Sequence, residues 1–174
     1  MKYIVKIIVI TFLVFGINSS FAEDKIAYVD MNKILTESKV GVYVEKELTK
    51  IHKGNLDKFK KEEEALKKDE IDLISKRNVM NADEFNKKIT ALREKASEYQ
   101  DLRREKFDMI NSKRNNATEE VMKTLQPIFA KYAEDNNISI IIEKKSIIVG
   151  KNEFDVSQDI IDELDKKLPS IKLN

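Results

Sequence analysis

The sequence predicts an α+β fold that is mainly α, in which a long antiparallel helical hairpin projects from a small β-containing body. Half of the 70 residues from Glu45 to Arg114 are charged and lie in helix-forming sequence, so this segment cannot form a compact core by itself. The flanks carry short β-branched stretches that are typical of strands. We therefore expect a body made of residues 23–44 and 117–174, and an arm made of residues 45–116.

The N-terminus has the pattern of a secretory signal peptide over residues 1–22. Two lysines precede an apolar run from Ile7 to Ile17, and small Ser20 and Ala22 then come before a predicted cut between Ala22 and Glu23. A retained membrane anchor is the alternative. The run of 11 residues is short against the roughly 20 residues that span a bilayer, which favours cleavage.

Composition excludes several classes of function. The formal net charge is +1, and removal of residues 1–22 takes away two lysines and leaves −1, so no strong field draws the chain toward nucleic acid or acidic membranes. The chain has no cysteine, and it therefore has no disulfides or thiol chemistry.

The segment from Lys25 to about Asn78 is predicted to begin with a strand and to continue as a helix. The stretch "KIAYVDM", from Lys25 to Met31, is rich in β-formers. A helix then extends to about Asn78, with a weak point at Gly41. Its sparse apolar residues include three spaced seven apart, which make a narrow stripe that suits one partner helix: Phe59, Leu66 and Leu73.

A second helix follows a predicted turn near 77–83. Asn81 followed by Glu84 has the spacing of a capping box, and positive charge precedes it where a helix end favours positive charge. One continuous helix is the alternative. After the turn, a heptad-like seam contains Phe85, Ile89, Leu92, Ala96 and Tyr99, so two stripes can pair as a hairpin. Pro127 predicts a kink or joint farther along.

The C-terminal flank predicts two strands and a short helix. The strands are Ile138–Glu143 and Ser146–Gly150, and Ser157 is the expected N-cap of the helix. Three consecutive isoleucines in the first of these strands call for cover on both faces. Three short strands are too few to close a barrel, so we expect a body shared between subunits. The expected body residues are Ile26, Tyr28, Ile140, Ile141, Ile142 and Ile148.

No catalytic, cofactor-binding or metal-binding residues are expected. The four glycines are far apart and form no phosphate loop, and His52 is the only histidine. The acidic run Glu62–Glu64 lies beside lysines at helical spacing, as solvated ion pairs do. Basic stretches such as "DLRREK" lack an interleaved aromatic platform, so we expect no nucleic-acid binding.

The order of these segments resembles the Skp/OmpH family of periplasmic chaperones. The resemblance is carried by the signal peptide, "KIAYVDMNKIL", the long charged hairpin, "ISIIIEKKSIIVG" and "DVSQDIIDEL". It implies a jellyfish-like homotrimer in the periplasm, with a shared β-barrel body and coiled-coil arms that enclose a cavity. It also implies an ATP-independent holdase that binds unfolded outer-membrane proteins and prevents their aggregation.

Within such a cavity, the candidate client contacts are Tyr99, Leu102 and Phe107. Family members are often strongly basic, which suits lipopolysaccharide or anionic lipid, whereas this chain is neutral. The only candidates for such a contact are Lys76, Arg77, Lys87 and Lys88 near the tip. The alternative function is a structural coiled-coil protein that spaces or tethers parts of the envelope, but a plain rod would not need β-rich ends.

Overall fold

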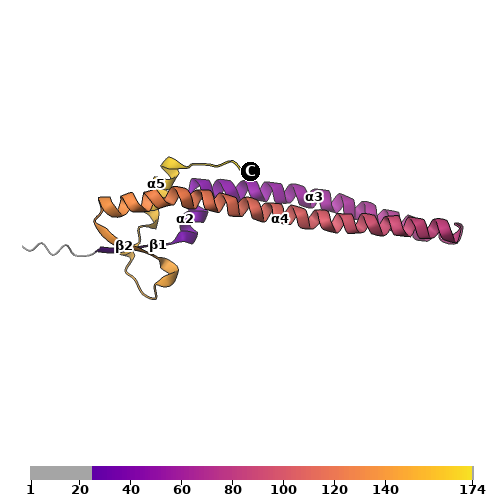
Figure 1. Cartoon of the computed structure of the whole chain (residues 1–174), viewed down its shortest axis with the longest axis horizontal. Coiled ribbons are helices and arrows are strands. Elements are labelled where there is room, and N and C mark those ends of the chain that lie inside the picture. The colour runs from indigo at the N-terminus through magenta and orange to yellow at the C-terminus, as the bar shows by residue number, and fades with distance from the viewer. Residues whose placement is uncertain (1–24, 174) are drawn as a thin grey trace, which may run out of the picture.

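The computed structural model describes residues 25–173, so the signal peptide predicted over 1–22 and its cut between Ala22 and Glu23 lie outside the described residues. Two long helices, α3 (Lys39–Ser75) and α4 (Ala82–Asp135), lie side by side and dominate the molecule (Figure 1). A small sheet lies at the end opposite the turn that joins them (Figure 1). The mainly helical α+β class is thus confirmed. Between residues 25 and 173, no helix combines the length and apolar character needed to cross a membrane.

The sheet consists of β1 (Lys25–Val29) and β2 (Ile138–Glu143), paired in parallel with Ile26 opposite Ile140 and Tyr28 opposite Ile142. The pairing is parallel because the whole helical hairpin serves as the crossover between the strands. The strand predicted at Ser146–Gly150 is wrong. The chain instead forms short 3-10 turns, η1 (Lys144–Ser146) and η2 (Asn152–Phe154), because no further strand of the described chain lies beside residues 147–149 to pair with them.

The first helical stretch is divided at Ser38 and not at Gly41. Helix α2 (Met31–Glu37) ends there, and the Ser38 hydroxyl accepts a hydrogen bond from the Gly41 amide at 3.2 Å, which caps α3. Gly41 serves a different purpose. A methyl group at this position would lie 2.7 Å from the carbonyl carbon of Leu35 and still closer to its oxygen, so only glycine allows α2 to approach α3 this closely.

The chain reverses across residues 76–81. Lys76 caps the end of α3, and the Asn81 side chain accepts a hydrogen bond from the Glu84 amide at 2.7 Å to begin α4. The joint predicted at Pro127 does not form, because α4 continues through this residue and packs buried side chains on both sides of it. The helix ends before Asn137, whose φ of 52° is one that asparagine tolerates.

The hydrophobic core lies where the sheet, α2, α5 (Ser157–Lys167) and the adjacent ends of α3 and α4 meet. Ser157 is the first residue of α5 and not its N-cap, since Val156 occupies the N-cap position. Its hydroxyl instead accepts from the Asp30 amide at 2.7 Å and donates to Asp155 Oδ1 at 2.5 Å. The most deeply buried core side chains are Ile34, Val40, Leu48, Leu125, Ile160 and Leu164.

After α5 the chain continues as an extended tail that turns back along the long helices (Figure 1). Ile171 of this tail is buried and belongs to the core, and Leu168 and Leu173 pack against it. The Lys113 ammonium group donates a hydrogen bond to the Leu173 carbonyl oxygen at 2.9 Å. The tail therefore connects α5 to α4 well along the hairpin.

Candidate functional site

A cluster of aromatic rings holds the middle of the hairpin together. The ring of Phe59 on α3 lies 6.2 Å from that of Tyr99 and 6.4 Å from that of Phe107, both on α4, between centroids. The Arg103 guanidinium lies 5.8 Å from the Phe59 ring and 5.6 Å from the Tyr99 ring. The His52 ring packs 5.7 Å from Phe107. Edge-to-face rings and a cation over aromatic faces attract one another, so the cluster fastens α3 to α4.

The predicted seam residues differ in how far they are covered. A two-helix interface shields only a narrow stripe, because each helix meets a single neighbour. Residues at the centre of the stripe are buried and those at its margin are half-buried or open. Phe59 and Leu73 are buried, Leu66, Phe85, Ile89 and Leu92 are half-buried, and Ala96 is exposed.

Of the three candidate client contacts, Tyr99 is placed differently from Leu102 and Phe107. Tyr99 is only 6% exposed, and its hydroxyl donates a hydrogen bond to the Phe59 carbonyl oxygen at 3.3 Å, so it belongs to the interior of the seam. Leu102 and Phe107 remain 42% and 41% exposed. They can therefore contact another chain.

Helix α3 and the turn also expose apolar side chains that the sequence analysis did not name as candidate client contacts. They lie outside the seam, and for that reason a heptad pattern does not identify them. An isolated exposed leucine is ordinary, but a series along one pair of helices offers repeated weak contacts. The large apolar side chains exposed on α3 and in the turn are Val42, Tyr43, Leu56, Ile71, Ile74 and Val79.

Three of the four basic residues considered at the tip have partners within the arm. The hydrogen bond from Lys76 holds the pKa of Asp72 below its ordinary value. The tip therefore presents mixed charge, and contact of these residues or of Lys87 with anionic lipid stays a prediction. The pairs are Lys76 Nζ with Asp72 Oδ2 at 2.6 Å, Lys88 Nζ with Glu84 Oε1 at 3.3 Å, and the Arg77 guanidinium 5.9 Å from the Phe85 ring centroid.

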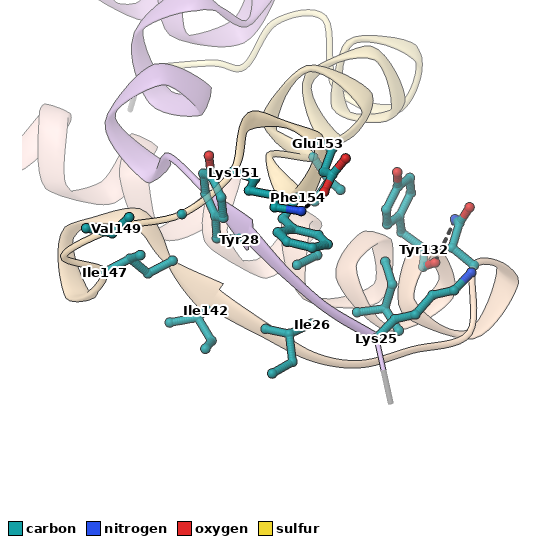
Figure 2. Close-up of a pocket in the computed structure, with 15 residues that line it drawn as sticks. Lys25, Ile26, Tyr28, Tyr132, Ile142, Ile147, Val149, Lys151, Glu153 and Phe154 are labelled. Atoms are coloured by element: carbon teal, nitrogen blue, oxygen red, sulfur yellow. Dashed lines mark hydrogen bonds and ion pairs between the residues drawn. The ribbon is translucent and has the colours of Figure 1, made fainter. Parts of the chain in front are cut away.

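An open groove of about 840 Å³ lies beside the sheet in the body. Figure 2 shows Ile26, Tyr28, Ile142 and Phe154 directed toward it from the sheet and the following loop. Ile141 packs against the core on the other side of the sheet. The groove is thus an apolar surface that this single chain leaves uncovered.

The other two predicted body residues lie in the open. Ile140 is half exposed, and Ile148 is fully exposed in the loop that replaces the predicted strand. Ile148 therefore contributes nothing to the core of a single subunit. Apolar side chains left open in and beside a sheet are typical of an interaction surface.

A charged network ties the ends of the two strands to the start of α5. Lys144 Nζ lies 3.3 Å from Asp30 Oδ2 and 3.7 Å from Asp155 Oδ2. Hydrogen bonds from the Lys33 amide and from Lys144 lower the pKa of Asp30. Burial raises the pKa of Asp155, but hydrogen bonds from Ser157 and the Lys144 charge hold it below its ordinary value overall. The network orients the loop that borders the groove.

Tyr132 borders the groove from α4 (Figure 2). Its hydroxyl donates a hydrogen bond to Asp159 Oδ2 of α5. Burial, together with this carboxylate, raises the pKa of Tyr132 to about 12. Within residues 25–173, no group of three or more His, Cys, Asp or Glu side chains is arranged to hold a metal ion.

Comparison with known proteins adds two findings. A family model described as outer membrane protein (OmpH-like) matches residues 25–164. The crystal structure of a candidate outer membrane chaperone (OmpH-like) from Caulobacter crescentus CB15 is similar, with a TM-score of 0.79 and 15% sequence identity over 87% of this chain and 89% of that chain. At this identity the likeness shows a shared fold. No curated protein matches the sequence.

Proposed function

Because this chain belongs to the OmpH-like family of outer membrane proteins, we propose that it is an ATP-independent holdase chaperone of the periplasm. It binds unfolded outer-membrane proteins between its helical arms and prevents their aggregation. The observation that supports this beyond family membership is the set of apolar side chains exposed on the arm, among them Leu56, Leu102 and Phe107.

These contacts suit a client that has no fixed shape. Each exposed leucine or aromatic ring on the arm can bury only a little surface against a client. Charged residues of both signs surround it. Many weak contacts on linked arms act together, because each bound segment raises the effective concentration of the next. The client is then held without a specific pocket and is released as it folds.

We propose that the body is shared by three copies of the chain. The support is the open groove beside the sheet, together with half-exposed Ile26 and Ile140 on paired strands. Within residues 25–173 the sheet has two strands, which is marginal by itself, so strands from a neighbouring copy would stabilise it. When three copies share one body, their arms surround a common space. A client can be held in this space.

Holding is tested by diluting a urea-unfolded outer-membrane barrel protein into buffer without nucleotide and following light scattering. We expect the protein to suppress aggregation, and Leu102→Ser to weaken suppression, because it removes an exposed apolar contact. Gln100→Ser, two residues away on an exposed position of the same helix, is the matched control. Aggregation at an undiminished rate with the parent protein would refute the proposal.

Sharing of the body is tested by sedimentation across a concentration series. Ile140→Asp puts a charge on the open side of β2 and should give folded monomers with unchanged helical circular dichroism. The control is Val79→Asp, the same type of change at a side chain that is 85% exposed at the far end of the arm. A parent protein that is monomeric at all concentrations would contradict the shared body.

A further inference from the structure

The tail from Leu168 to Leu173, here called the strap, is held in place by its three large apolar residues. Chain ends are usually poorly ordered unless something ties them down. In the strap Ile171 is only 6% exposed and lies in the core, and Leu168 and Leu173 on either side of it pack against the same cluster. Pro169 directs the chain out of α5, because it cannot continue the helix. The strap is therefore a packed element.

The near end of the strap is fixed to the body through α5. The Asp165 carboxylate accepts a hydrogen bond from the Lys39 amide at 2.7 Å, which joins α5 to the start of α3. The hydroxyl of Tyr132 donates to Asp159, which joins α5 to α4. The strap consequently starts from a point that is held by both long helices.

The far end of the strap is fixed to the arm. Lys113 Nζ donates to the Leu173 carbonyl oxygen at 2.9 Å. Tyr132 and Lys113 are 19 residues apart on one continuous helix, so the two attachments of α5 and the strap to α4 are separated by about 28 Å. Figure 1 shows the tail following the hairpin over this part of its length.

The reach of the strap coincides with the reach of the core. Among the described residues of the core cluster, Ile110 is the member of α4 nearest the tip, and Leu48 is the buried member of α3 nearest the tip. Over this region the core cluster of α3 and α4 also includes side chains of α2, α5 and the strap. Farther out they have only each other, and the buried side chains there are Phe59, Leu73 and Tyr99. A two-helix seam with few buried contacts opens at lower free energy than a three-element packing.

We infer that the strap braces the base of the arm and sets the position, just beyond Leu48 and Ile110, from which the arm bends. Residues 168–173 lie after residue 164, where the family match ends, so the match does not cover the strap. The inference does not depend on the proposed chaperone function, because it concerns the mechanics of the hairpin alone.

The test is amide hydrogen exchange, read by mass spectrometry, on the full-length chain. Ile171→Asp removes the buried side chain of the strap, and Lys172→Asp alters the exposed neighbour as a matched control. We expect exchange in segments 45–52 and 109–117 to rise by about tenfold or more in Ile171→Asp and to stay at the parent rate in Lys172→Asp. Exchange near the tip, in segments 70–90, should not change in either variant.

A second variant keeps the test decisive if Ile171→Asp loosens the whole body. Lys113→Met removes the hydrogen bond to Leu173 but keeps the apolar stem, so it leaves the core filled. It should raise exchange in the same two segments to a smaller extent, with the sheet and α5 unchanged. The inference is overturned if Lys113→Met leaves the base of the arm as protected as in the parent, or if both variants raise exchange evenly throughout the body.

Discussion

Gly41→Ala should destabilise the protein, although alanine is the better helix former. The new methyl group would lie 2.7 Å from the Leu35 carbonyl carbon and closer still to the oxygen. Both are backbone atoms at the corner between α2 and α3, so no side-chain rotation relieves the clash. Such overpacking costs about 3 kcal/mol at the upper end of its usual range. The gain in helix propensity offsets about 1 kcal/mol, which leaves a net loss of about 2 kcal/mol.

Gly54→Ala provides the matched control, since it makes the same change in the same helix. A methyl group at Gly54 would meet nothing within 4 Å. Only the propensity difference then acts, and the variant should be more stable than the parent by about 1 kcal/mol. The two substitutions are thus expected to shift stability in opposite directions.

The assay is urea unfolding followed by circular dichroism at one fixed protein concentration, because assembly would otherwise contribute to the apparent stability. With a slope of about 2 kcal/mol per molar urea, Gly41→Ala should lower the midpoint by about 1 M and Gly54→Ala should raise it by about 0.5 M. If Gly41→Ala unfolds at or above the parent midpoint, the explanation of this glycine by close helix approach is wrong.

Three further predictions concern the seam and the titrating groups. Tyr99→Phe removes the hydrogen bond to the Phe59 carbonyl and should cost about 1 kcal/mol in urea unfolding, whereas Phe59→Ala should cost about 3 kcal/mol or more; equal losses would show that the ring cluster does not hold the arm. The pKa of Tyr132 is raised from 10.0 to about 12, so its contribution to stability is present below pH 10 and is lost as pH rises toward 12. Tyr132→Phe should therefore lose less stability than the parent over this interval in alkaline unfolding curves, and an identical pH dependence would contradict the assignment. The pKa of Asp30 is lowered from 3.8, so the stability it contributes is present above about pH 4 and is lost as pH falls through the lower folded value. Asp30→Asn should reduce the loss of unfolding free energy as pH falls. An unchanged loss would show that the interactions of Asp30, including that with Lys144, do not contribute to stability.

Elements governed by local chemistry could be predicted from the sequence. The α3–α4 turn is one of these, because Asn81 and Glu84 interact across three residues and the cap depends on nothing distant. The strands that contain Ile26 and Ile140 also follow from β-branched runs with polar ends, although their parallel pairing with each other does not. In each case the residues that decide the structure are neighbours in sequence.

Features that depend on distant partners could not be predicted in this way. Residues Ile147 to Val149 have the composition of a strand, but β-propensity reflects packing on a sheet, and no strand of residues 25–173 pairs with them. Tyr99 reads equally well as a seam or a surface residue, because its burial depends on where Phe59 and Arg103 lie. The strap has no periodic pattern, and its placement depends on where the core and Lys113 lie.

The parallel pairing of β1 with β2 has a consequence for how the chain acquires its structure. Lys25 pairs with Ile138, so the entire hairpin must be present before the first strand finds its partner. Helices form in about a microsecond, whereas closing a sheet across so long a separation is slow. We therefore expect the arm to form first and the sheet to close last. During that interval the apolar residues of β1 remain open, and at this stage the chain is most exposed to mispairing with other newly synthesised copies.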